Sequence, residues 1–212
     1  MKKYLMEGIG AFFLTLTVII TSLTATAAPG AMPLAVGSTL MVLSFAGGQI
    51  SGAHYNPAVS LAFLIQGKLD RFDLPYYWLA QFAGGILAAF IAAFLLRCSG
   101  ITDVPARGND GFCALIAEFL GAFLLLFVIL AAAHRRDPAS QPTSAMAAGF
   151  AQFSGMFVFG SISGGFFNPA VVAGLCIAGA VAWGDWWLYG LGASLGAAAA
   201  VSVFRVIYND PV

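Results

Sequence analysis

Two short polar segments interrupt an apolar chain of 212 residues, and both carry the tripeptide Asn-Pro-Ala. The segments are Ser51–Val59 (SGAHYNPAV) and Ser163–Val171 (SGGFFNPAV). Asn is a favoured N-cap, and Pro is favoured at the first helical position, so each tripeptide predicts a helix start. With its carbonyl oxygen used by the cap, each Asn side chain still offers NH₂ donors. The tripeptides consist of Asn56, Pro57 and Ala58, and of Asn168, Pro169 and Ala170.

Nucleophilic catalysis is another chemistry that these segments suggest, because they contain Ser51, Ser163 and His54. A serine nucleophile needs a base within reach and an acid that orients the base. The second segment has Phe166 where the first has His54, so no serine and histidine constellation is repeated. We therefore expect no catalytic residue, no cofactor and no metal site, and we do not expect an enzyme.

The two segments belong to an internal duplication. Glu7 lies 49 residues before Asn56 (56 minus 7), and Glu118 lies 50 residues before Asn168 (168 minus 118). A chance recurrence of one tripeptide would not reproduce this spacing. We therefore predict two copies of one unit, repeat one over 1–98 and repeat two over 112–208, within a single membrane domain that covers 1–212.

The composition places this domain in a membrane. Hydrophobic residues make up 60% of the chain, charged residues make up 8%, and the mean hydropathy is +0.91. Such values are typical of a polytopic membrane protein. The net charge of zero argues against nucleic acid as a partner. The spacing of the three cysteines indicates neither a metal site nor a disulfide framework.

The long apolar stretches predict six membrane spans, since a bilayer core of about 30 Å needs about 20 residues of helix. The segments after Asn56 and Asn168 are too short to span: about 11 residues of helix reach about 16 Å. Both are therefore predicted to be re-entrant half-helices. Five glycines are expected to allow close helix packing, namely Gly84, Gly85, Gly121, Gly192 and Gly196. The spans lie near 8–28, 33–50, 74–96, 113–133, 143–162 and 186–206.

The first span also has features of a cleavable signal peptide. Lys2 and Lys3 precede an apolar run that ends near Ala27. The run contains Glu7, whose counterpart is Glu118 of the second repeat, and this match favours a retained span.

Three spans per repeat require the second repeat to be inserted upside down relative to the first, so the half-helices enter from opposite faces. The basic residues give the orientation through the positive-inside rule. With a cytoplasmic N-terminus, seven of them are inside and two, Arg97 and Arg107, are outside. We expect both termini in the cytoplasm and the protein in the plasma (inner) membrane. The seven are Lys2, Lys3, Lys68, Arg71, Arg135, Arg136 and Arg205.

The inverted half-helices predict a pore for neutral solutes. Their N-termini meet near the bilayer centre, and each is equivalent to about half a positive charge. This charge repels cations and turns the oxygen of a passing water towards the asparagines, which interrupts the hydrogen-bonded chain that protons would follow.

The paired segments, together with Ala117–Gly121 (AEFLG), resemble the aquaporin, or major intrinsic protein, family over essentially the whole chain. The resemblance implies an all-α membrane fold of six helices and two half-helices with an inverted repeat. It also implies a homotetramer in the lipid bilayer with one pore per protomer, which passes water and small neutral solutes. Glu7 and Glu118 match family glutamates that brace the re-entrant loops, and His54 matches a histidine that lines the pore or packs in the loop.

The chain departs from the family at the outer constriction, where an arginine usually stands three residues after the second Asn. Here that residue is Val171. The other filter positions, matched by their offsets, are Val36, Met156 and Gly165. This filter is apolar, with no arginine and no aromatic ring, and Tyr189 stands where water channels tend to carry one of two aromatics. We therefore predict a wider, aquaglyceroporin-like filter that admits glycerol, urea, ammonia, hydrogen peroxide or undissociated metalloid acids.

Two other functions compete with this prediction. A strict water channel would have the same fold. A secondary transporter can also have inverted repeats and broken helices, but coupling to an ion gradient needs ionisable groups in the membrane. Glu7, Glu118 and His54 are the candidates within the predicted spans and loops, and neither Asn has an acidic neighbour.

Overall fold

The computed structural model describes residues 1–23, 30–101, 111–134 and 141–209, and every regular element in these ranges is helical. The all-α prediction is therefore confirmed. Six helices are long, and two of nine residues each follow Asn56 and Asn168, as predicted. The long helices are α1 (Lys2–Ser22), α2 (Ala31–Ser51), α4 (Leu74–Cys98), α5 (Gly111–His134), α6 (Gln141–Phe159) and α8 (Trp186–Tyr208), and the short ones are α3 (Pro57–Ile65) and α7 (Pro169–Ile177).

Five of the long helices are apolar and long enough to cross a membrane by length and composition. The sixth, α6, has 19 residues and includes two glutamines, so it is more polar than the others. It packs along α2 in the same bundle. Its place in the fold therefore identifies it as the predicted span near 143–162.

The first span begins six residues earlier than predicted, at Lys2, and its predicted end at 28 lies outside the described residues. Lys3 and Tyr4 remain helical because both bind Asp73, just before α4. The Lys3 ammonium lies 2.5 Å from one carboxylate oxygen, and the Tyr4 hydroxyl donates to the other at 2.7 Å. These hydrogen bonds, that of Lys3 first, hold the pKa of Asp73 below its ordinary value.

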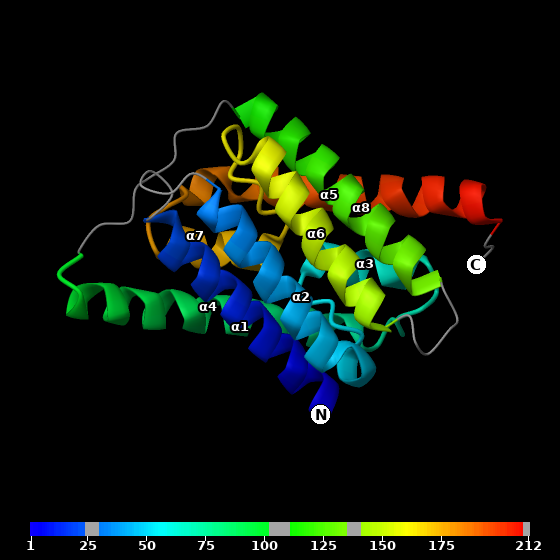
Figure 1. Ribbon diagram of the computed structural model, residues 1–212, viewed down its shortest axis with the longest axis horizontal. Helices are drawn as coiled ribbons and strands as arrows, with labels where there is room; N and C mark the ends of the chain where they lie inside the picture. Colours follow the sequence, from blue (N-terminus) through cyan, green and yellow to red (C-terminus); the bar gives the residue numbers. More distant parts are fainter. Residues whose placement is uncertain (24–29, 102–110, 135–140, 210–212) are drawn as a thin grey trace.

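The two halves pack in matching pairs. Helix α1 packs against α4, and their counterparts α5 and α8 pack against each other. The half-helices are exchanged: α3 of the first half packs against α8, and α7 of the second half packs against α4. Figure 1 shows this arrangement, with the half-helices inside the cage of long helices. The repeat boundaries at 98 and 112 stay a prediction.

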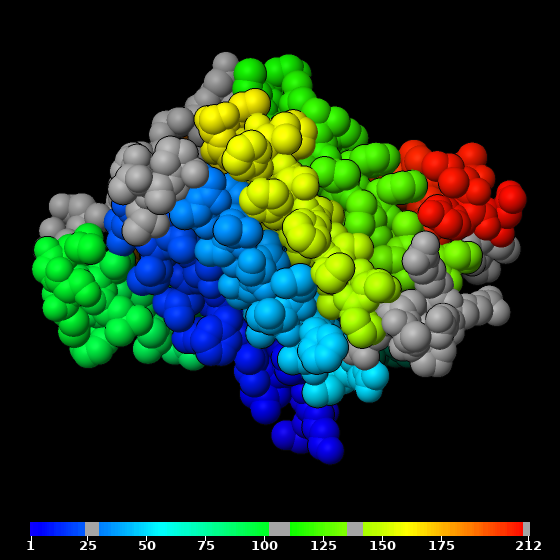
Figure 2. All heavy atoms as spheres, in the orientation of Figure 1, coloured from blue at the N-terminus to red at the C-terminus, as the bar shows by residue number. Residues whose placement is uncertain are grey.

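The halves join where α2 crosses α6. Gly37 and Gly149 meet there, and a Cβ on either one would lie 2.6 Å from the carbonyl oxygen of the other. They are 112 residues apart (149 minus 37), as are Asn56 and Asn168 (168 minus 56). The two helices lie side by side across one face of the molecule (Figures 1 and 2). The crossing therefore relates the two repeats symmetrically.

The five glycines singled out in the sequence also lie at close approaches. Gly85 faces the carbonyl oxygen of Ala170, and Gly192 faces that of Leu115, where a Cβ would lie 2.6 Å and 2.8 Å away, respectively. Gly84, Gly121 and Gly196 are likewise pressed against neighbouring backbone or an aromatic ring. Small residues thus allow the helices to pack backbone to backbone, as predicted.

The outer surface is apolar. Leu5, Phe90 and Phe157 are each more than 60% exposed, while polar side chains such as Glu7 and Glu118 are fully buried. In water this arrangement would be costly, whereas a bilayer solvates apolar side chains. The chain is therefore an integral, multi-pass membrane protein.

Candidate pore between the half-helices

Each half-helix begins at its asparagine. Asn56 has an extended backbone, and its Oδ1 accepts from the N–H of Ala58 at 2.8 Å. Asn168 Oδ1 accepts from the N–H groups of Ala170 at 3.1 Å and Val171 at 3.4 Å. Proline follows each asparagine at the first helical position. Both caps predicted from the sequence are present.

The two asparagines also join the loops to each other. Asn56 Nδ2 donates to the carbonyl oxygen of Phe167 at 2.8 Å, and Asn168 Nδ2 donates to that of Tyr55 at 3.0 Å. Each amide therefore uses one N–H to hold the opposite loop and has a second N–H. This reciprocal pair brings the positive ends of α3 and α7 together at the centre of the protein.

Glu7 holds the first loop from within α1. One of its oxygens accepts from Ser51 Oγ at 2.6 Å and from the N–H of His54 at 3.0 Å. The other accepts from the N–H of Tyr55 at 2.6 Å and from Gln81 Nε2 at 2.8 Å. The contacts agree with the predicted bracing, and Gln81 is a partner that the sequence did not reveal.

Glu118 makes the equivalent contacts in the second loop. It accepts from Ser163 Oγ at 2.6 Å and from the N–H groups of Phe166 at 3.1 Å and Phe167 at 2.6 Å. Phe167 has a φ of 53°, and Tyr55 in the first loop has a φ of 52°. A left-handed conformation costs a residue with a side chain about 1–2 kcal/mol. The buried carboxylates offset that cost by binding the N–H groups of these strained residues.

Tyr189 fastens the second loop to α8. Its side chain is buried, its ring lies 5.9 Å from that of Phe166, and its hydroxyl donates to the carbonyl oxygen of Ser163 at 3.1 Å. Tyr77 does the same in the first loop, donating to the carbonyl oxygen of Ser51 at 2.7 Å. Tyr189 therefore contacts the second loop, and it is not among the residues that line the cavity.

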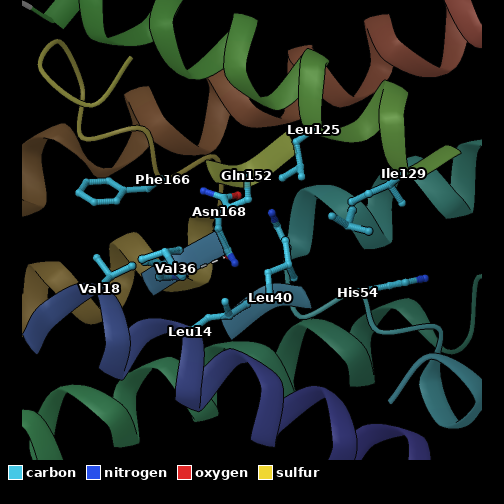
Figure 3. A pocket seen from close by; sticks show the side chains of 13 residues that line it. Leu14, Val18, Val36, Leu40, His54, Leu125, Ile129, Gln152, Phe166 and Asn168 are labelled. Atoms are coloured by element: carbon cyan, nitrogen blue, oxygen red, sulfur yellow. Dashed lines mark hydrogen bonds between the residues drawn. The ribbon is translucent and has the colours of Figure 1, made fainter. Parts of the chain in front are cut away.

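A narrow cavity runs past the two asparagines (Figure 3). Its volume of about 20 Å³ is enough for a single water molecule. In Figure 3, Phe166 lies towards one end and His54 towards the other. None of the 13 lining residues is Asp, Glu, Lys or Arg. They are Leu14, Val18, Val36, Leu40, His54, Asn56, Val59, Leu125, Ile129, Gln152, Phe166, Asn168 and Val171.

His54 packs against residues of α3 and also lines the cavity. Its Nδ1 lies 3.1 Å from Ser60 Oγ, and its ring centre lies 4.5 Å from that of Phe63. The side chain is only 4% exposed, and it still borders the cavity. Both roles expected for this residue are thus compatible with its position.

Two of the four predicted filter residues, Val36 and Val171, line the cavity. The other two, Met156 and Gly165, do not; they contact each other, and a Cβ on Gly165 would lie 2.7 Å from the Met156 Cα. Gly165 therefore makes room for α6. The role of these four residues in selectivity stays a prediction.

Phe166, which is not one of the four predicted filter residues, also lines the cavity and brings an aromatic ring to it. The offset from the asparagine pointed to its neighbour Gly165. Gln152 was also missed, although a glutamine one turn before Met156 in a predicted span is a signal in itself. For both residues, the rotation of the helix or the course of the loop determines whether the side chain borders the cavity.

Comparisons with known proteins agree with this architecture. The model of the major intrinsic protein family matches residues 1–136 and 106–211. The aquaglyceroporin from Plasmodium falciparum, a solved structure, superposes with a TM-score of 0.74 over 96% of this chain and 97% of that one, at 21% identity. This likeness shows the fold.

Two curated relatives add sequence similarity. The glycerol uptake facilitator protein-like 6 of Lactiplantibacillus plantarum is 34% identical over 99% of this chain and 100% of its own length. Aquaporin NIP2-1 of Zea mays is 32% identical over 82% of this chain, which spans 58% of the maize protein's length. With its duplicated capped half-helices, braced loops and central cavity, the chain belongs to the major intrinsic protein family.

Proposed function

We propose that the chain is a passive transmembrane channel for water and for small neutral solutes that include molecules larger than water. It is a channel of the major intrinsic protein family, and its site offers hydrogen bonds without a fixed charge. One observation carries the proposal: a cavity that holds two capped helix N-termini and, among its lining residues, no Asp, Glu, Lys or Arg.

The helix ends exclude cations. Two N-termini, each equivalent to about half a positive charge, face the same short stretch of lumen. A cation there would lose its water shell and meet the N–H donors of Asn56 and Asn168, whose oxygens are engaged in the caps. A neutral solute can instead accept a hydrogen bond from these donors. The charge of the passing molecule therefore decides whether it crosses.

The proposed selectivity filter consists of Val36, Met156, Gly165 and Val171. Because the resting cavity holds about one water, a molecule such as glycerol can pass only if lining side chains change rotamer. Val36 and Val171 are apolar and make no side-chain hydrogen bonds that would resist this change. The full-length similarity to a glycerol uptake facilitator-like protein supports glycerol as a solute. Urea, ammonia, hydrogen peroxide and undissociated metalloid acids are the other candidates.

The membrane setting forms part of the proposal. The basic residues favour cytoplasmic termini in a plasma (inner) membrane. The assembly is a homotetramer in which each protomer has its own pore, as the resemblance to the family implies.

The test is an osmotic jump on proteoliposomes, followed by light scattering. With an impermeant osmolyte, we expect fast shrinkage compared with empty liposomes. With glycerol or urea, we expect fast shrinkage followed by fast reswelling. Shrinkage without reswelling would identify a strict water channel. Neither response, combined with uptake that depends on a proton or sodium gradient, would identify a secondary transporter.

A further inference from the structure

Gln152 is a buried polar residue in the wall of the pore. It lies on α6, its side chain is 5% exposed, and it borders the same cavity as Asn168. Figure 3 shows the two side chains next to each other near the centre of the cavity. One N–H of the Gln152 amide donates to the carbonyl oxygen of Gly165 at 3.2 Å. The amide also has a second N–H and an oxygen, Oε1, that this bond does not use.

The two asparagine amides of the cavity offer hydrogen bonds in one direction. The side-chain oxygens of Asn56 and Asn168 accept from backbone N–H groups in the caps. Both asparagines therefore present N–H donors to the lumen. Among the three amides that line the cavity, Gln152 is the one whose oxygen is not engaged in a cap, so it supplies a side-chain acceptor beside the donor of Asn168.

The symmetry-related position in the other repeat has no amide, so this group is present on one side of the pore. The residue 112 positions before Gln152 is Leu40 on α2 (152 minus 40), each standing three residues after the glycine of the α2 and α6 crossing. Leu40 also lines the cavity and is 6% exposed. At this position the matching walls thus differ: one side chain is a primary amide and the other is a hydrocarbon.

We propose that Gln152 is a specificity-determining residue that, together with Asn168, binds neutral solutes able both to donate and to accept hydrogen bonds, with urea-like amides as the preferred class. This inference rests on the proposed function. The oxygen of such a solute accepts from the Asn168 amide, while its own N–H group donates to Gln152 Oε1. Apolar side chains, including Val36 and Leu40, also line the cavity and offer no competing partner.

Urea depends on this amide pair, Gln152 and Asn168, more than water does. A urea molecule that enters an apolar lumen loses several hydrogen bonds to water, and each unpaired polar group raises its free energy. Water in single file keeps its neighbours in front and behind. Removal of the Gln152 amide should therefore slow urea more than it slows water.

The decisive variant is Gln152→Met, which keeps an unbranched side chain of similar size and removes the polar atoms. Urea and water permeabilities are measured on the same proteoliposomes. We expect the ratio of urea to water permeability to fall about threefold to tenfold, which is the factor that one net hydrogen bond contributes. Leu40→Met is the matched control, because it changes shape at the symmetry-related position without a change in polarity. Its two permeabilities should change together and leave the ratio as in the parent.

Each other outcome has a distinct meaning. If Gln152→Met slows water and urea by the same factor, Gln152 only holds the Gly165 loop, and the inference is wrong. An equal drop of the ratio in Leu40→Met would also overturn it, because shape would then explain the effect. If the parent protein passes water but no urea, no glycerol and no other neutral solute, the proposed function fails before the variant is considered.

Discussion

At the scale of single residues, two buried glutamates hold two strained loops. Glu118 binds a serine hydroxyl and two backbone N–H groups, and one of these belongs to Phe167, which has a positive φ. The groups around the carboxylate are all donors. This position therefore requires a side chain with two acceptor oxygens. A glutamine has the same shape, but its amide nitrogen would place a donor against donors.

This requirement predicts the effect of Glu118→Gln. The substitution keeps the size of the side chain and loses at least one charge-assisted hydrogen bond, so we expect it to lower the free energy of unfolding by about 1.5–3 kcal/mol. Water permeability should fall with it, because the loop that carries Asn168 loses its brace. Thermal unfolding in detergent measures the first effect and an osmotic jump the second. An unchanged unfolding midpoint would show that Glu118 does not hold the loop.

Val171 lines the cavity and is the residue predicted to stand at the position of the family's filter arginine. Val171→Arg adds a bulky, charged group to a lumen of about 20 Å³. We expect glycerol permeability to fall by about tenfold or more, with a smaller loss for water, since the larger solute meets the obstruction first. Val171→Leu is the control for size without charge. Glycerol flux equal to that of the parent in the arginine variant would remove Val171 from the filter.

At the scale of elements, the long helices hold each half-helix by side-chain hydrogen bonds. Arg205 on α8 donates from Nε to Gln66 Oε1 at 3.1 Å and also binds the carbonyl oxygen of Ile65. It thus places a positive charge at the C-terminus of α3, where the helix dipole is negative. The indole nitrogens of Trp78 and Trp186 donate to the carbonyl oxygens of Pro57 and Pro169 at 3.1 Å and 3.2 Å. The half-helices are therefore fixed at their ends by the long helices.

The crossing of α2 and α6 gives a prediction at the same scale. In Gly149→Ala the new Cβ would lie 2.6 Å from the Gly37 carbonyl oxygen, a backbone atom that cannot move without separating the helices. We expect a loss of about 1–3 kcal/mol of stability. Gly184→Ala is the control, since no atom lies within 4 Å of a Cβ there. Thermal unfolding of both variants measures the difference, and equal midpoints would mean that the crossing can relax.

At the scale of the whole molecule, local sequence motifs were sufficient to predict the helices and the internal repeat. The Asn-Pro caps are determined by neighbouring residues, so the starts of α3 and α7 could be predicted from the sequence, and the spacing of Glu7 and Glu118 indicated the repeat. The lining of the pore was harder to predict. Gln152 and Phe166 border the lumen because of the rotation of α6 and the course of the second loop, which depend on tertiary contacts such as that of Met156 with Gly165.

The orientation of the whole molecule in the membrane can be tested with single cysteines. Cys98 is exposed at the C-terminal end of α4, the end opposite to Asp73 and the N-terminus of α1. If the termini are cytoplasmic, Cys98 lies on the outer side of the membrane. In a variant that retains only Cys98, we expect a membrane-impermeant maleimide to label intact cells. A variant whose single cysteine replaces Arg71, exposed near the opposite end of α4, should react only after the cells are opened. The reverse labelling pattern would show that the protein has the opposite orientation, with Phe166 towards the cytoplasmic mouth of the pore and His54 towards the outer mouth.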